Sequence, residues 1–154
     1  LPLHPGFAES WPQLRSQLGV RPAVVVDIAN VMGSVPDGWW RDRAGAARRY
    51  LARISALADR GVPAAGLGLP EHVWFPEWVA VIEGQAKGAR DAEGVNVVRA
   101  PGEGDDEIVV QASRLVARGD VVTVVTSDRG LSGRIEAAGA TVRGTRWLLD
   151  LIRA

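Results

Sequence analysis

The chain of 154 residues contains no cysteine, and it has only two histidines and one lysine. Without cysteine it can form neither a disulfide nor a zinc site built from thiolates. The histidines, His4 and His72, do not stand in the spacing of a zinc hydrolase, and they offer few candidates for the base of a histidine-based triad. Any metal ion must therefore be held by oxygen ligands, a chemistry that suits Mg²⁺ or Mn²⁺.

A long hydrophobic run is also absent. No stretch reaches the roughly 18 apolar residues that mark a membrane span, and no segment typical of a signal peptide stands at the start. We therefore expect a soluble, cytoplasmic protein without membrane contact. The length and the hydrophobic content of 47% favour one domain over residues 21–154, with residues 1–20 forming an N-terminal arm packed on it.

The chain has no excess of charge of either sign, because 18 basic residues balance 18 acidic ones. Net charge therefore does not indicate a nucleic-acid-binding protein. All the basic residues except Lys87 are arginines. Guanidinium groups suit phosphate recognition, although a GC-rich genome would produce the same bias in composition.

Apolar, β-branched segments alternate with segments of helical periodicity along the chain. The clearest strand is 23–26, a continuous apolar run that ends at Asp27 and is typical of a strand buried on both faces. The clearest helix covers residues 42–60, with Asp42 as its N-cap and Gly61 as its stop. Further strands are expected at 78–82, 95–98, 121–126 and 141–143, and further helices at 8–18, 105–118, 129–138 and 147–152. This alternation predicts an α/β fold with a mostly parallel sheet covered by helices on both faces.

Acidic residues follow or precede several of these elements at one predicted edge of the sheet. Asp27 ends the first strand, Glu83 ends the strand 78–82, and Asp128 follows the strand 121–126, while Asp105 and Asp106 open a helix. Ligands of such sheets bind beyond the carboxyl ends of the strands. Carboxylates that converge there repel one another unless a cation lies between them. A divalent metal ion would resolve that conflict and leave room for a phosphate oxygen and a water molecule.

Each acid also has a structural explanation. Asp105 could be an N-cap and Asp106 a partner of the helix dipole, and Ser127 could cap the helix that starts near Arg129. For Asp27 the functional interpretation is favoured, because an acid directly after a buried run of three valines is costly unless it is paired.

Three blocks of sequence resemble the NYN domain, a branch of the PIN-like nuclease superfamily. Residues 24–31 (VVVDIANV) are similar to its opening Asp-x-x-Asn motif. Residues 104–108 (GDDEI) resemble its acidic helix start, and residues 124–131 (VVTSDRGL) resemble its Thr/Ser-x-Asp block. The blocks occur in family order and span most of the domain.

The resemblance implies a three-layer, Rossmann-like α/β/α sandwich, dependence on Mg²⁺ or Mn²⁺, and cleavage of RNA phosphodiester bonds. It would make Asp27, Asp105 and Asp128 metal ligands, either directly or through water, with Asp106 replacing or assisting Asp105. The fourth acid of the family has no obvious match, and Glu83 is the candidate because it also ends a strand.

Two polar residues of the same blocks would support the catalytic acids. In this interpretation Asn30 orients the Asp27 carboxylate or contacts substrate, whereas its structural alternative is a cap on the following turn. Ser127 would form a hydrogen bond near the metal.

Substrate contacts are suggested by residues that flank the acidic motifs. Arg41, Arg43 and Arg129 could steer phosphates, although solvated surface arginines have the same pattern. Trp40 could stack on a nucleobase, although at least one of two adjacent tryptophans usually packs inward.

Two other functions stay open on the sequence alone. A nucleotide or pyrophosphate phosphohydrolase would use the same acidic edge, and a non-catalytic module could retain the fold while binding RNA or protein. A dinucleotide-binding domain and a P-loop enzyme are excluded, because neither glycine-rich motif is present. RNA is the expected partner, a homodimer stays open, and the sequence identifies no protein partner.

Overall fold

A computed structural model of the protein describes residues 20–84, 86 and 92–154. The predicted N-terminal arm over residues 1–20, apart from Val20, and the helix expected at residues 8–18 lie outside the described residues. In the described part of the chain, no helix combines the length and the apolarity that crossing a bilayer requires.

The centre of the fold is a five-stranded sheet in which every pair of neighbouring strands is parallel. In spatial order the strands are β5 (Val95–Arg99), β4 (Glu77–Ile82), β1 (Pro22–Asp27), β6 (Val121–Val125) and β7 (Thr141–Arg143). The predicted parallel sheet is therefore confirmed, and its strand boundaries differ from the expected ones by one residue or less.

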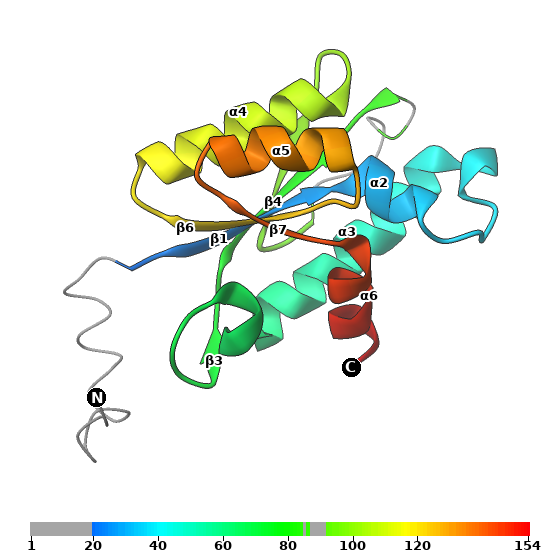
Figure 1. The fold of residues 1–154 in the computed structure, drawn as a ribbon. Coiled ribbons are helices and arrows are strands. Elements are labelled where there is room, and N and C mark those ends of the chain that lie inside the picture. The colour runs from blue at the N-terminus through cyan, green and yellow to red at the C-terminus, as the bar shows by residue number, and fades with distance from the viewer. Residues whose placement is uncertain (1–19, 85, 87–91) are drawn as a thin grey trace, which may run out of the picture.

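Helices cover both faces of the sheet, which gives the three layers that were predicted. One face carries α2 (Ile28–Gly33), α3 (Arg43–Arg60) and α6 (Thr145–Arg153), and the other carries α4 (Gly104–Ala117) and α5 (Arg129–Ala137) (Figure 1). Asp42 is the N-cap of α3, as predicted, since its carboxylate accepts a hydrogen bond of 2.9 Å from Gly45 N.

The central position of β1 follows from its side chains. Val24 and Val26 point into the core under α3, whereas Ala23 and Val25 point into the core under α4, and all four are completely buried. Alternate residues of a strand face opposite sides of a sheet. A run without a polar residue therefore fits only a strand that is covered on both faces.

Five short elements were not predicted from the sequence. They are α2, the 3₁₀ turns η1 (Trp39–Arg41) and η2 (Ala64–Leu67), and the strands β2 (Val62–Pro63) and β3 (Val73–Trp74), which pair antiparallel. Elements of this length carry too little periodicity to be recognised. In addition, α6 begins at Thr145, two residues before the expected start.

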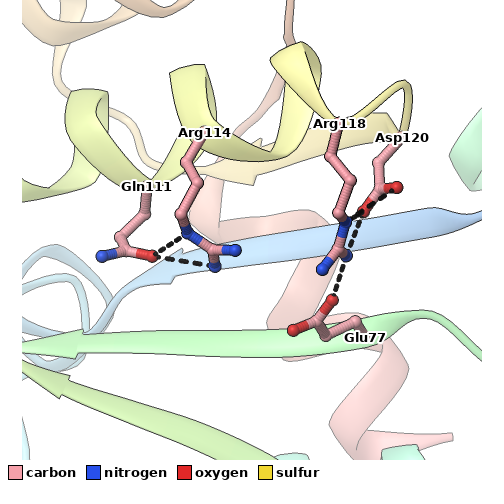
Figure 2. Close-up of polar contacts among 5 residues, drawn as sticks. All are labelled: Glu77, Gln111, Arg114, Arg118 and Asp120. Atoms are coloured by element: carbon pink, nitrogen blue, oxygen red, sulfur yellow. Dashed lines mark hydrogen bonds and ion pairs between the residues drawn. The ribbon is translucent and has the colours of Figure 1, made fainter.

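The edge of the sheet where β4 and β6 begin carries a network of ion pairs (Figure 2). The Arg118 guanidinium contacts both Glu77 and the buried Asp120, and its Nε lies 3.1 Å from Asp120 Oδ2. Nearby, Arg114 donates hydrogen bonds of 3.1 and 3.2 Å to Gln111. These charges neutralise one another, so we interpret this edge as structural.

At the opposite edge, where the strands end, lies the reversal point, at which the order of the strands changes from one side of β1 to the other. From β1 the chain proceeds to β4 and β5 on one side, and it then returns to the other side of β1 to form β6 and β7. The carboxyl ends of β1 and β6 therefore flank the reversal, which is where open parallel sheets bind their ligands.

Candidate active site

Asp27, the last residue of β1, lies at this reversal and is only 6% exposed. Its Oδ1 accepts a hydrogen bond of 3.2 Å from Asn30 N and thereby caps α2. Its Oδ2 accepts a hydrogen bond of 3.1 Å from Thr126 Oγ1. The pKa of Asp27 is raised to about 6, mainly because the group is buried. The two hydrogen bonds lower the pKa, whereas the negative charges of Asp105 and Glu83 contribute to its rise. A buried carboxyl group with neighbouring acids is typical of a functional site.

Asp128 stands at the start of α5, three residues after the end of β6. Its Oδ1 accepts a hydrogen bond of 2.9 Å from Leu131 N, so Asp128 is the N-cap of α5. Its own backbone N–H donates to Thr126 Oγ1 over 3.2 Å. The alternative in which Ser127 caps this helix is therefore wrong. Thr126 joins Asp128 to Asp27 through a single hydroxyl group.

Ser127 and Asn30 connect the elements around the site. Ser127 N donates a hydrogen bond of 2.8 Å to Asn30 Oδ1, and Ser127 Oγ accepts one of 3.0 Å from Thr145 N. Ser127 Oγ also lies 3.2 Å from Thr145 Oγ1. The side chain of Asn30 thus fixes the loop after β6 instead of capping its own turn, and its backbone is what holds Asp27. Ser127 links that loop to the start of α6.

Asp105 and Asp106 occupy the first turn of α4 but face different neighbours. Asp105 is half-buried, and its pKa is raised by burial and then by the charges of Asp128 and Glu103. Asp106 has a side chain that is 83% exposed and pairs with Arg134 of α5 at 2.8 Å. The N-cap of α4 is Glu103, so the alternative that Asp105 caps this helix is wrong. The structure brings Asp105, and not Asp106, to the other acids.

Glu83 follows β4 and reaches the beginning of α4. Its Oε2 accepts a hydrogen bond from Gly104 N, and a Cβ atom placed on Gly104 would lie 2.5 Å from that oxygen. Glycine at position 104 therefore allows the Glu83 carboxylate to come this close to the start of α4. Because the charge of Glu83 also raises the pKa of Asp27, the structure places Glu83 with the other acids.

We refer to Asp27, Glu83, Asp105 and Asp128 as the acidic cluster. Its donors are carboxylate oxygens, which fit a hard divalent cation such as Mg²⁺ or Mn²⁺, and a cation would relieve their mutual repulsion. Within the described ranges, no group of three or more histidine, aspartate or glutamate side chains is arranged to hold a metal ion. The type of donor fits such an ion although the side chains are not gathered around one point, so water molecules would have to complete the coordination.

The predicted substrate residues lie on the surface beyond α2 and beside Asp128. Trp39 packs against the core while Trp40 is 52% exposed, and the two rings meet edge to face at 6.0 Å. The guanidinium of Arg41 lies 6.0 Å from the Trp40 ring, and that of Arg43 lies 5.2 Å from the Trp39 ring. Arg129 is exposed and has no ion pair with the residues that the structure describes.

Sequence reasoning assigned no role to two residues that organise the site, Thr126, which stands in the Thr/Ser-x-Asp block, and Thr145. Both are buried. A hydroxyl-bearing residue at the end of a valine-rich strand was a usable signal for Thr126. No comparable signal existed for Thr145, because its contact with Ser127 joins segments 18 residues apart.

Comparison with known proteins bears on the fold. No family model matches the chain, and no curated protein matches it in sequence. Among solved structures, Rae1 (YacP) from Bacillus subtilis is similar, with a TM-score of 0.65 and 17% identity over 85% of this chain and 73% of that chain. The W164L mutant of the same protein gives a TM-score of 0.59 and 20% identity over 86% and 75% of the two chains. The chain therefore shares its α/β architecture with Rae1, which is consistent with a Rossmann-like fold.

Proposed function

We propose that this protein is a metal-dependent ribonuclease that hydrolyses RNA phosphodiester bonds at the acidic cluster. The observation that carries the proposal is Asp27, which is buried at the reversal point of a parallel sheet within reach of the charges of Asp105 and Glu83 and is linked to Asp128 through Thr126. Such an arrangement costs folding energy, because a buried carboxylate beside like charges is disfavoured. A catalytic site is the usual reason to retain it.

Mg²⁺ or Mn²⁺ would be held by Asp27, Asp105 and Asp128, with Glu83 as the fourth oxygen donor. When bound, the ion supplies positive charge that offsets the repulsion among the carboxylates and stabilises the charge developing on the phosphate. The carboxylates must be ionised to bind it, so protonation of Asp27 competes with metal binding.

The residues of the chain position these carboxylates before any substrate arrives. Thr126 and Asn30 N fix both oxygens of Asp27, and Leu131 N fixes one oxygen of Asp128 and leaves Oδ2 available. Ser127 is anchored by Asn30 and Thr145, so the loop between β6 and α5 is held on both sides. Preorganisation of this kind reduces the reorganisation that the reaction requires.

The test is cleavage of a fluorescent single-stranded RNA in the presence of Mn²⁺ by the parent protein, Asp27→Asn and Glu136→Gln. Glu136 is exposed on α5 and lies outside the acidic cluster, so its variant is the matched control. We expect the parent and Glu136→Gln to cleave the RNA and Asp27→Asn to be inactive. Nucleoside triphosphates are assayed in parallel.

The other outcomes identify the alternatives. Consumption of triphosphates without cleavage of RNA would overturn the proposal in favour of a nucleotide phosphohydrolase. Inactivity of the parent on both substrates would favour a non-catalytic binding module.

A further inference from the structure

A groove lies along α6 beside the loop that joins β6 to α5. It has a volume of about 400 Å³ and begins at Ser127, the neighbour of Asp128. One wall is formed by residues 34–36, and the other by the first two turns of α6 together with Arg153. None of the four acids lines the groove, and Ser127 is the residue through which it adjoins the proposed catalytic centre.

The charge of this groove is opposite to that of the acidic cluster. Arg146 and Arg153 line it, and no acidic side chain does. Both arginines are exposed, and neither has a hydrogen bond or an ion pair with a described residue. They are seven residues apart on the same face of α6, which separates them by about 10 Å along the helix axis. Unlike Arg118 and Arg134, they are available to a ligand.

The groove continues into a second hollow of about 440 Å³. The two hollows share Val35, Leu149 and Arg153. The second hollow adds Arg53, whose guanidinium lies 5.3 Å from the Tyr50 ring, and one acid, Asp37. The whole path therefore carries three arginines against one carboxylate.

Apolar side chains lie between these charges. Val35, Pro36 and Leu149 line the first hollow together with the arginines. A single-stranded nucleotide chain presents the same two kinds of surface, because its phosphates are anionic and its sugars and unpaired bases are partly apolar. An acidic centre repels phosphates, so a substrate chain must obtain its attractive contacts from adjoining surfaces.

We propose that this groove, lined by Arg146, Arg153 and Arg53, binds the backbone of single-stranded RNA on one side of the bond to be cleaved. The inference rests on the proposed function and specifies where its substrate lies. Arg146 contacts the phosphate nearest to the acidic cluster, and Arg153 contacts one farther along the strand. The start of α6 adds the favourable end of its helix dipole beside Arg146.

The experiment compares Arg146→Glu/Arg153→Glu with Arg114→Glu. Arg114 is exposed on α4, on the other face of the sheet, and contacts only Gln111 among the described residues (Figure 2). Binding of a fluorescent single-stranded RNA is measured by anisotropy in EDTA, where cleavage is suppressed, at several salt concentrations. Hydrolysis of bis(p-nitrophenyl) phosphate with Mn²⁺ is measured separately, because this small diester needs no groove.

We expect the double variant to bind RNA roughly tenfold or more weakly, with the salt slope reduced by about 1.4, or about 0.7 for each lost phosphate contact. Its hydrolysis of the small diester should fall far less than its affinity for RNA, which shows that the fold and the acidic cluster are intact. Arg114→Glu should match the parent in both assays.

If the double variant and Arg114→Glu bind RNA with equal affinity, the groove assignment is overturned. The proposed function would still stand in that case if the parent cleaves RNA. A parent that neither binds nor cleaves RNA would remove both. The neutral variant Arg146→Ala/Arg153→Ala should show the same direction with a smaller effect, and its failure to weaken binding would also count against the groove.

Discussion

Thr126 Oγ1 donates a hydrogen bond of 3.1 Å to Asp27 Oδ2 and joins the ends of two neighbouring parallel strands that lie 99 residues apart in the sequence. The same hydroxyl accepts a hydrogen bond from Asp128 N. One buried side chain therefore fixes the relative positions of two acids in the proposed centre. It also opposes the rise in the pKa of Asp27 that burial causes.

Replacement of Thr126 by valine tests this relationship, because valine has nearly the same shape and lacks the hydroxyl. Loss of the donated bond should raise the pKa of Asp27 above its present value of about 6. Activity that requires ionised Asp27 should then begin at a higher pH. The measurement is the pH dependence of kcat/KM for RNA cleavage, and Thr126→Ser should restore the parent profile. An acidic limb at the same pH in all three proteins would contradict this role.

The stability of the protein without metal should depend on Asp27 with a definite sign. The pKa of Asp27 is about 6 in the folded protein against an ordinary value of 3.8, so the folded state holds its proton more tightly. Below the lower value Asp27 is protonated in both states and imposes no penalty. As pH rises through about 6, the penalty for a buried carboxylate becomes complete and stability is lost.

Asp27→Asn should therefore raise the free energy of unfolding at pH 7.5 in EDTA by up to about 3 kcal/mol, since one pKa unit corresponds to about 1.4 kcal/mol. Asparagine retains an oxygen that can accept from Asn30 N. Urea denaturation at pH 7.5 and at pH 4 provides the measurement, and the gain should disappear at the lower pH. A variant less stable than the parent at pH 7.5 would show that the ionised carboxylate stabilises the fold.

The sheet and the long helices could be predicted because their signals are local. The run of three valines before Asp27 and the helical spacing of residues 42–60 each identify an element without knowledge of the rest of the chain. The short helix α2 could not be predicted in this way. It has six residues, and it depends on the Asp27 cap and on the burial of Ile28, Val31 and Met32.

The positions of the acids could be predicted, because the carboxyl ends of the strands lie at one edge of a parallel sheet. The surroundings of each acid could not be predicted. Asp105 and Asp106 are adjacent in sequence, yet Asp105 is half-buried whereas Asp106 is exposed. Asp106 pairs with Arg134, which lies 28 residues away and reaches it only in the folded protein. Arg146 and Arg153 carried no motif. Their relation to Ser127 depends on the packing of α6 beside the loop after β6.

Substitution of the two adjacent acids should therefore give unequal effects. Asp105→Asn removes a charge from the acidic cluster and should lower RNA cleavage by about 100-fold or more, as expected for a ligand or an electrostatic group at the centre. Asp106→Asn breaks an exposed ion pair with Arg134, which contributes roughly 0–1 kcal/mol at most. Its activity should fall far less. Steady-state cleavage by the two variants decides the question, and an equal loss in both would place Asp106 in the centre as well.

Gly104 offers a way to move Glu83 without altering its charge. A Cβ atom at Gly104 would approach Glu83 Oε2 to 2.5 Å, so Gly104→Ala should displace that carboxylate from the start of α4. If Glu83 contributes an oxygen to the metal, the affinity for Mn²⁺, measured by electron paramagnetic resonance, should fall by roughly tenfold. Thermal stability should change little in comparison, because alanine is the better helix former by about 1 kcal/mol.

The same substitution in a Glu83→Ala background isolates the cause. With no carboxylate left to displace, Gly104→Ala should have no further effect on the affinity for Mn²⁺, so the two changes should be strongly non-additive. Additive losses would mean that Gly104→Ala acts through the backbone of α4 and its neighbour Asp105. An unchanged affinity in both single variants would exclude Glu83 as the fourth acid and leave Asp27, Asp105 and Asp128 as the complete set of proposed ligands.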